Sequence, residues 1–364
     1  MPDAAHFLNA FLVSVVLVTG LRHLPMPYRL LDQPTERKTH VGLVPLIGGL
    51  AMFIAFVLAL VLLNRPLQRQ GGLLAALSLL VAVGVVDDLR DLRPLAKLVM
   101  QCAAAALMVV PDWRILDVVG EVGGAEPLRL GFVGFPVSLL FVVGLINAIN
   151  MIDGVDGLAG GVVAAILFWL ALIAGAIGRH TELEIILLLF FATLGFLVFN
   201  LRTPWRRSAS VFMGDAGSMM LGGSVAHFTI LLVTRPAAEG YASESASLPA
   251  LCWLLALPAI DTLSLIVRRL LAGNSPFAGD RRHLHHLLLE AGLSPAQVTA
   301  LLVAVATILG GIGFAGVVLK VPDMVMALGL LLPVAAHTVF VCRRPARTAE
   351  APPVGATSDV ALFR

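Results

Sequence analysis

Five segments of an otherwise apolar chain carry dense polar side chains that could do chemistry. One concentrates carboxylates and amides, one sets a single Asp among small residues, and three mix acids with basic residues. They are DQPTERKTHVGLVPLIGG (32–49), DDLRDLRPLAK (87–97), NAINMIDGVDGLAGG (147–161), FMGDAGSMMLG (212–222) and SPFAGDRRHLHHLL (275–288). Carboxylate and amide oxygens suit Mg²⁺, and basic side chains bind phosphate. These types indicate metal-assisted chemistry on a phosphate.

The segment 87–97 begins with two adjacent acids. Asp87 and Asp88 repel each other, and a cation such as Mg²⁺ would relieve the repulsion. Asp91 completes a DDxxD spacing, which binds magnesium and diphosphate in prenyl-diphosphate synthases, or it is simply ion-paired with Arg93 or Lys97. Lys97 begins the next apolar stretch, where it could meet a phosphate. The alternative is a pair of hydrated acids at a helix end.

The segment 147–161 repeats polar residues every three positions. Asn150, Asp153 and Asp156 share one face if the turn stays helical, and the neighbouring glycines allow close approach of a ligand. A glycine-rich helix–loop–helix with capping acids would explain one Asp but not the whole set. The DGxDG pattern also resembles the CDP-alcohol phosphotransferases, but the Ala-Arg that follows it there and their later Asp pair are missing.

The segment 212–222 places Asp215 at an expected helix start. The residue could cap the helix, or it could hold a metal against a diphosphate bound at the helix N-terminus. Phe212, three residues earlier, could stack on a base or simply pack.

The fifth segment contains three of the nine histidines. His283, His285 and His286 follow Asp280, Arg281 and Arg282. Because no Cys or carboxylate with ligand spacing accompanies them, this run of basic groups fits phosphate better than zinc.

The elements that position these segments are membrane-spanning helices. The chain is 59% hydrophobic and 13% charged, with a net charge of +2 and a mean hydropathy of +0.94. Soluble domains are about 25% charged, so an ordinary cytosolic enzyme, a disordered protein and a basic-patch nucleic-acid binder are excluded. The three cysteines give neither a disulfide framework nor a CxxC metal signal.

A spanning helix needs about 20 apolar residues, and the chain supplies about eleven such stretches. We predict an all-α polytopic membrane protein. We expect residues 1–342 to form a single integral-membrane domain and 343–364 to form a short disordered cytoplasmic tail. The first span is a retained helix rather than a signal peptide. The predicted spans are 5–24, 43–63, 71–87, 95–111, 135–152, 157–177, 183–201, 213–234, 248–271, 297–317 and 322–342.

Basic residues set the expected orientation. One set of loops carries 18 of the 25 Lys and Arg residues and the other carries 7, so the positive-inside rule puts the N-terminus outside and the C-terminus inside. All five polar segments then lie at the cytoplasmic face, as one site assembled from five loops. The outer stretch 113–134, with β-branched runs around a Gly-Gly turn signal, predicts a small periplasmic β-hairpin.

The five segments, in this order, resemble those of the polyprenyl-phosphate N-acetylhexosamine-1-phosphate transferases, known as glycosyltransferase family 4. The resemblance spans residues 32 to about 290. The DRRHLHH form resembles the undecaprenyl-phosphate N-acetylglucosamine-1-phosphate transferase branch, whereas the muramoyl-pentapeptide branch typically has three consecutive histidines. The branch starts cell-surface polysaccharides such as O-antigen, a lipopolysaccharide component, common antigen and teichoic acid.

The resemblance implies transfer of N-acetylglucosamine-1-phosphate from UDP-N-acetylglucosamine to undecaprenyl phosphate, with release of UMP. It implies that Asn150 and Asp215 coordinate Mg²⁺, for which Mn²⁺ could substitute. Asp87, Asp88, Lys97, Asp153 and His283 are the implied catalytic residues, the role of Asp153 being unassigned. The implied substrate-binding residues are Asp156 on the uracil, Phe212 stacked on it, and Arg282, His285 and His286.

The expected partners are the UDP-sugar, undecaprenyl phosphate and the bilayer, without nucleic acid, and a homodimer stays open. The expected location is the bacterial cytoplasmic (inner) membrane. Direct attack by the lipid phosphate is favoured because a phosphomonoester is largely a dianion at neutral pH, and a covalent aspartyl intermediate is the alternative. Three other functions stay open: the same reaction with another UDP-N-acetyl-deoxyhexosamine, a catalytically inactive scaffold or sensor of the same fold, and a secondary transporter. Transporter sites lie near the membrane midplane, which disfavours the last.

Overall fold

The computed structural model describes residues 4–25, 30–32, 43–63, 70–111, 114–121, 127–234, 245–273 and 283–343. Arg282, which we expected to bind substrate, lies outside the described residues, as does the predicted tail apart from Arg343. The described part is a helical bundle with two small two-stranded sheets, so the predicted fold class is confirmed.

Nine helices within these ranges are long and apolar enough to cross a membrane. They are α1 (Ala4–Leu21), α3 (Gly71–Arg90), α5 (Gly134–Ile152) with its preceding turn, α6 (Leu158–Ala176), α7 (His180–Asn200), α8 (Gly214–Val233), α9 (Leu248–Leu271), α11 (Pro295–Val318), and α12 (Asp323–Gly329) continued by α13 (Leu331–Cys342). Two shorter apolar helices, α2 (Gly48–Leu62) and α4 (Pro94–Val109), fall on the remaining predicted spans. The chain is therefore a multi-pass membrane protein.

Two predicted spans need correction, and one helix was not predicted. The second span begins at Gly48 rather than residue 43, because Val44–Pro45 forms strand β2, paired with β1 (Leu31–Asp32). The last span breaks at Leu330, since Pro333 lacks the N–H that would continue the helix and its ring clashes one turn back. The added helix is α10 (Leu284–Glu290), which contains two of the three histidines of the HLHH run, His285 and His286.

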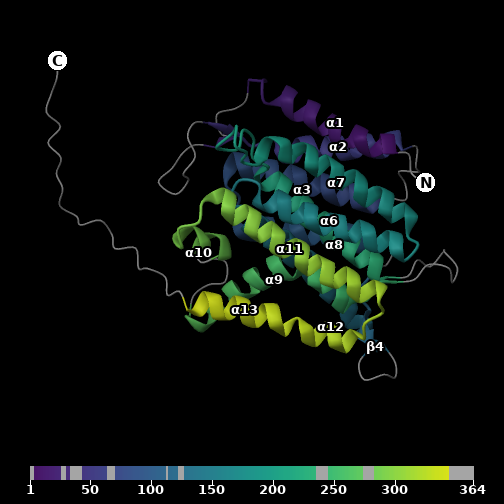
Figure 1. Cartoon of the computed structure of the whole chain (residues 1–364). Coiled ribbons are helices and arrows are strands. Elements are labelled where there is room, and N and C mark those ends of the chain that lie inside the picture. The colour runs from purple at the N-terminus through teal and green to yellow at the C-terminus, as the bar shows by residue number, and fades with distance from the viewer. Residues whose placement is uncertain are drawn as a thin grey trace, which may run out of the picture.

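Helix α8 is the centre of the bundle. It contacts α2, α3, α5 and α6, while α1 and α12–α13 lie at opposite sides of the molecule (Figure 1). Small residues allow the close crossings: a Cβ added to Gly84 of α3 would lie 2.3 Å from the Ala216 Cα. Such small-residue contacts are typical of membrane helices. This crossing brings the end of α3 beside the start of α8.

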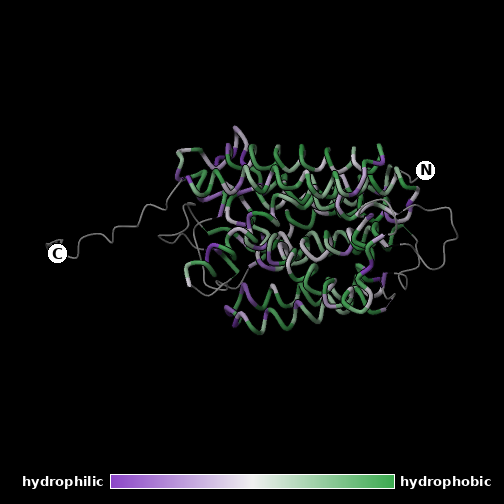
Figure 2. The backbone as a smooth tube through the Cα atoms, turned by 90° about the horizontal axis from the view of Figure 1, so that it is seen from below, coloured by the Kyte–Doolittle hydropathy of each residue, from purple (hydrophilic) through white to green (hydrophobic). Residues whose placement is uncertain are grey.

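The predicted β-hairpin is present. Strands β3 (Val118–Glu121) and β4 (Pro127–Arg129) pair antiparallel, and the Glu121 amide donates to Asp323 Oδ2 at the start of α12 over 2.8 Å. Figure 1 shows β4 at the opposite end of the bundle from α10. Between the two ends, hydrophobic residues run along the helices (Figure 2).

Candidate active site

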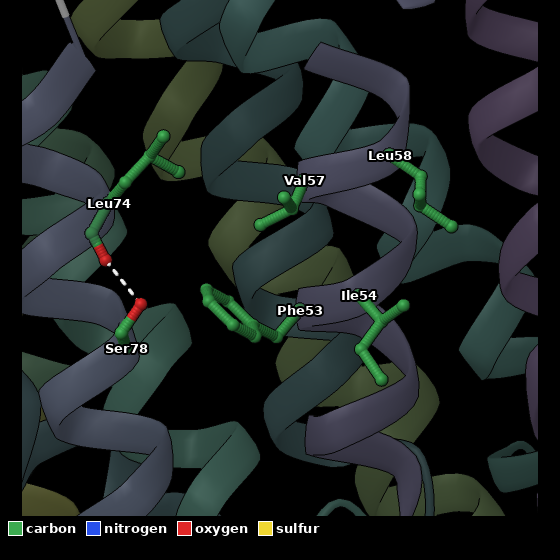
Figure 3. Close-up of a pocket in the computed structure, with 6 residues that line it drawn as sticks. All are labelled: Phe53, Ile54, Val57, Leu58, Leu74 and Ser78. Atoms are coloured by element: carbon green, nitrogen blue, oxygen red, sulfur yellow. Dashed lines mark hydrogen bonds between the residues drawn. The ribbon is translucent and has the colours of Figure 1, made fainter. Parts of the chain in front are cut away.

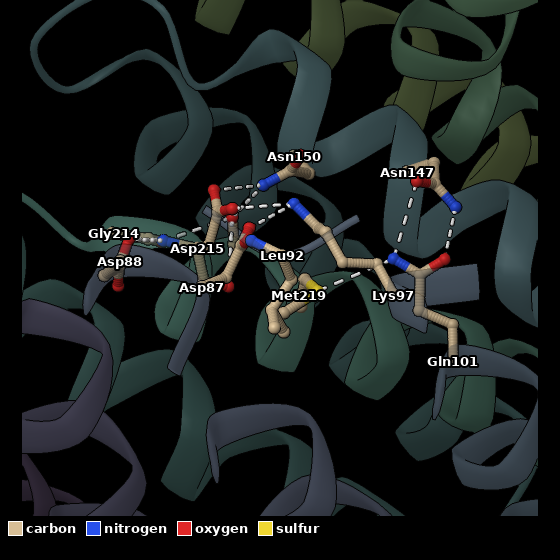
Figure 4. A network of polar contacts seen from close by, with 11 residues as sticks. Asp87, Asp88, Leu92, Lys97, Gln101, Asn147, Asn150, Gly214, Asp215 and Met219 are labelled. Carbon is tan, nitrogen blue, oxygen red and sulfur yellow. Dashed lines mark hydrogen bonds and ion pairs between the residues drawn. The ribbon is translucent and has the colours of Figure 1, made fainter. Parts of the chain in front are cut away.

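Four helix ends meet at one end of the bundle and bring together five of the predicted site residues (Figure 4). Asp87 and Asp88 lie in the last turn of α3, and Lys97 lies in the first turn of α4, which begins at Pro94. Asn150 lies in the last turn of α5, and Asp215 in the first turn of α8. Residues far apart in sequence therefore form one polar cluster.

The Lys97 ammonium joins two of the acids. Its Nζ lies 2.5 Å from Asp87 Oδ2 and 2.8 Å from Asp215 Oδ2. The other oxygen of Asp87 accepts from the Leu92 amide over 2.7 Å. Both Asp87 oxygens are thus engaged, and they hold the lysine between α3 and α8.

Asp88 caps helix α8 from a neighbouring helix. Its Oδ1 accepts from the Asp215 backbone amide over 3.0 Å. Gly214 allows this approach, because its φ is +67° and an added Cβ would lie 2.5 Å from Asp88 Oδ2. Asp215 therefore does not serve as the cap of its own helix, and its carboxylate is turned toward Lys97 and Asn150.

Asn150 fixes the other side of Asp215. Its Nδ2 donates to Asp215 Oδ1 and to Ser218 Oγ, each over 2.8 Å. One helical turn deeper, Asn147 Nδ2 donates to Gln101 Oε1 over 2.7 Å, and Gln101 is 1% exposed. This buried amide pair links α4 to α5 directly beneath the cluster and was not predicted.

The cluster fits a divalent cation in charge and donor type. With all four groups ionised, its three carboxylates and one ammonium carry two net negative charges. Asp88 Oδ2 is buried and has no hydrogen-bond partner among the described residues. No group of three His, Cys, Asp or Glu in the described ranges forms a ready-made metal cage. Mg²⁺ commonly binds through one or two carboxylates, waters and substrate phosphates, and this arrangement suits that mode.

Asn150 can act as a metal ligand only after its side-chain amide rotates. Its amide nitrogen, rather than its oxygen, faces Asp215. Asn150 and Asp215 can coordinate one ion together only if the Asn150 amide rotates so that its oxygen faces the ion. Which terminal atom of the amide is nitrogen and which is oxygen is assigned from the hydrogen-bond network.

Asp156 does not share a helix face with Asn150. Helix α5 ends at Ile152, and Asp153 follows with a non-helical backbone (φ −77°, ψ 59°). Asp156 Oδ2 instead accepts from Arg202 Nε over 2.8 Å and from the Ala209 amide over 2.9 Å. The predicted common face is wrong because the turn does not stay helical.

Phe212 lies two residues before the first residue of α8, Gly214. Its amide donates to the Pro45 carbonyl over 3.0 Å, and its carbonyl accepts from Gly48 over 2.9 Å. The segment from β2 to α2 therefore fixes the backbone of a ring that is half-buried at the same end of the bundle.

The three histidines form a second cluster. His283 is stacked on His285 with ring centroids 5.8 Å apart, and His286 lies 4.1 Å from His285. His285 is 1% exposed, and neither of its ring nitrogens has a hydrogen-bond partner among the described residues. Its Nε2 would lie 2.3 Å from a Cβ on Gly154, so it packs on the turn that follows α5. Burial, with the charges of His286 and His283, lowers the His285 pKa to about 3.

Asp261 is the one acid of α9, and sequence reasoning gave it no role. It is 3% exposed and lies 2.9 Å from His283 Nδ1 through its Oδ2. A lone acid in an apolar span is costly and commonly functional, which was the signal that could have found it.

Two recesses lie along the helices. One of about 520 Å³ runs between α6, α7 and α11, with Asp156 and Arg202 at its polar end. The other, of about 380 Å³, lies between α2 and α3 (Figure 3). Its six lining residues include no titratable side chain, and the Ser78 hydroxyl is bonded to the Leu74 carbonyl. The second recess is apolar and carries no chemistry.

Comparison with known proteins gives concordant matches. The family model described as Glycosyl transferase family 4 matches residues 71–233. The undecaprenyl-phosphate alpha-N-acetylglucosaminyl 1-phosphate transferase of Haemophilus influenzae is 33% identical over 326 residues, which cover 90% of this chain and 89% of that protein. Proteins of the same name are 32% identical in Yersinia pestis, covering 88% and 87%, and 31% identical in Escherichia coli K12, covering 89% and 87%.

Proposed function

The chain belongs to glycosyl transferase family 4, and from this premise we propose that it transfers N-acetylglucosamine-1-phosphate from UDP-N-acetylglucosamine to undecaprenyl phosphate and releases UMP. The observation that carries the proposal is the Lys97 ammonium held between Asp87 and Asp215 at the meeting point of four helix ends. Phosphoryl transfer depends mainly on positioning and on charge stabilisation, and this cluster supplies both.

The reaction exchanges one phosphorus–oxygen bond for another. An oxygen of the acceptor phosphate forms a bond to the β-phosphorus of the donor. The bond from that phosphorus to the bridging oxygen breaks, and UMP leaves with the electron pair. Since the acceptor is already largely a dianion at neutral pH, the protein need not remove a proton from it.

The chain's own residues would position the two phosphates. Lys97 donates to phosphate oxygens from a position fixed by Asp87, and Asp88 keeps the first turn of α8 in place through the Asp215 amide. Because Lys97 and the Leu92 amide already occupy both Asp87 oxygens, attack by Asp87 on the donor is disfavoured. Direct attack by the acceptor phosphate is therefore the proposed route, and a covalent intermediate on Asp88, whose Oδ2 has no partner among the described residues, is the alternative.

Mg²⁺ is the proposed metal, with Mn²⁺ as a substitute. Asp215 and a rotated Asn150 would hold it, and the unpartnered Asp88 Oδ2 lies in the same cluster. When bound, the ion would neutralise charge on the donor diphosphate.

The nucleoside and sugar contacts are also proposals. Asp156 would bind the uracil by releasing or sharing Arg202, and Phe212 would stack on the base. His283 would contact the diphosphate or sugar. Asp153 lies in the turn that directly follows α5, and we assign it no specific contact.

The proposed setting is a bacterial cytoplasmic membrane with the cluster facing the cytoplasm. The 18 to 7 distribution of Lys and Arg supports this orientation, because the richer set lies on the side of the polar segments. UDP-sugars are made in the cytosol, and they would then reach the cluster directly.

The test uses purified protein with Mg²⁺, undecaprenyl phosphate and a panel of UDP-sugars, and it follows UMP release. We expect release with UDP-N-acetylglucosamine. Release with none of the donors would refute the transferase function, and release only with a deoxy-amino sugar donor would move the specificity to that substrate.

A further inference from the structure

A carboxylate buried within the bundle holds the histidine cluster in place. Asp261 lies in α9, three residues after Pro258, and is 3% exposed. Its Oδ2 lies 2.9 Å from His283 Nδ1, and its Oδ1 accepts from the Leu284 amide over 2.9 Å. An unpaired carboxylate in an apolar span is costly, so these donors explain how the acid is tolerated there.

The pairing fixes the protonation of one ring nitrogen. An ionised carboxylate only accepts hydrogen bonds, so His283 Nδ1 is the donor. The Nε2 atom is then the ring nitrogen left to meet a ligand. A carboxylate that selects the tautomer of a histidine in this way also fixes the orientation of its ring.

The last span completes the arrangement. His337 of α13 lies 3.2 Å from Asp261 Oδ1 through its Nε2, and its side chain is 7% exposed. It therefore contacts the carboxylate oxygen that does not face His283. This contact ties α13 to α9 and to the segment that carries the histidines.

The histidines in turn contact the turn after α5. His283 stacks on His285, and His285 packs against Gly154, four residues after Asn150. A displacement of His283 would therefore reach the turn that carries Asp153.

We propose that Asp261 and His337 are positioning residues for His283. Together they hold His283 as the Nδ1–H tautomer, so that the Nε2 atom of His283 faces the donor's diphosphate or sugar. The proposal rests on the proposed transferase function. It assigns a role to two residues, one in α9 and one in α13, that lie outside the polar segments.

The first test is Asp261→Asn, which keeps the size of the side chain. An amide cannot accept on both of its terminal atoms, so it satisfies His283, Leu284 and His337 only if a tautomer changes. We expect kcat/KM for UDP-N-acetylglucosamine to fall about 10–100-fold, as on loss of an outer partner that orients a ligating histidine. Asp323→Asn is the matched control, because Asp323 also accepts from a residue of this part of the chain, the α9 N-cap Ser247, but at the hairpin end. It should leave kcat/KM unchanged.

A double-mutant cycle separates positioning from mere stability. If Asp261 acts through His283, Asp261→Asn added to His283→Gln should lower kcat/KM by less than about twofold. An equal loss in both backgrounds, or no loss in either, would overturn the inference. Absence of UMP release by the unmodified protein would instead refute the proposed function.

A measurement on the unmodified protein covers the case in which Asp261→Asn fails to fold. Nitrogen-15 spectra of labelled histidines distinguish the Nδ1–H and Nε2–H tautomers, and the His283 signal is identified by its loss in His283→Gln. The Nδ1–H form supports the inference, and the Nε2–H form contradicts it.

Discussion

The Lys97 ammonium lies 2.8 Å from Asp215 Oδ2, although the two residues are 118 positions apart in the chain. The contact joins the first turn of α4 to the first turn of α8. It exists because α3 and α8 cross closely at Gly84 and Ala216, which brings Asp87 to the same lysine. One cation thus links the ends of three helices at the proposed site.

Removal of the Lys97 charge should remove most activity. Lys97→Met takes away a preorganised cation and leaves Asp87 and Asp215 facing each other, so we expect kcat to fall about 10²–10³-fold. Lys97→Arg should retain more activity than Lys97→Met. UMP release measured beside Lys320→Met, an exposed lysine at the hairpin end, provides the control. Activity in Lys97→Met within threefold of the unmodified protein would contradict the role.

Asp215→Asn should change the response to metal as well as the rate. The substitution lowers the net negative charge of the cluster and removes one proposed ligand, so we expect about a 10³-fold loss of turnover in a protein that stays folded. The Mg²⁺ concentration needed for half of the remaining rate should rise. Titration of UMP release with Mg²⁺ and with Mn²⁺ checks this, and an unchanged titration midpoint would place the metal elsewhere.

Gly214→Ala should lower both thermal stability and kcat, and backbone strain accounts only for the loss of stability. Both Gly214 and Gly178 have positive φ values, of +67° and +77°, but only Gly214 has a close neighbour, Asp88 Oδ2. Strain at such positions costs about 1–3 kcal/mol, so both variants should lower thermal stability. Gly214→Ala alone should also lower kcat, because the added Cβ displaces Asp88 from the Asp215 amide. Equal activity in the two variants would refute the coupling.

His285 should make the protein less stable in acid. Burial lowers its pKa to about 3, below the ordinary value of 6.5. Between these two values the unfolded chain binds more protons than the folded chain. The contribution of His285 to the free energy of unfolding is therefore fully present above pH 6.5 and is lost as the pH falls toward 3. His285→Gln should reduce the decline of the melting temperature between pH 7.5 and 5. The same decline in both proteins would show that other groups cause it.

The elements and most of the site followed from local sequence patterns. Apolar runs of spanning length predicted the helices, and dense polar runs at their ends predicted Asp87, Lys97 and Asp215 as site residues. Hydropathy could not reveal that Pro45 lies in a strand or that the last span breaks at Leu330, because both depend on backbone detail within apolar stretches.

The contacts between distant residues could not be predicted. Asp88 appeared to be part of a paired acid site, but it caps α8 because of where two helices cross. The spacing of Asp156 suggested a shared helical face, yet the helix ends first. The Gln101–Asn147 and Asp261–His283 pairs join different helices. Such pairs are set by the packing of helices and not by periodicity within one of them.

The most direct test of the account follows the β-phosphorus of the donor. UDP-N-acetylglucosamine labelled with ³²P at that position is incubated with the purified protein, Mg²⁺ and undecaprenyl phosphate. The account predicts that the label enters the lipid fraction with release of unlabelled UMP, and that Lys97→Met slows both about 10²–10³-fold. Label recovered in UDP would mean transfer of the sugar alone, and it would contradict transfer of the sugar phosphate at this cluster.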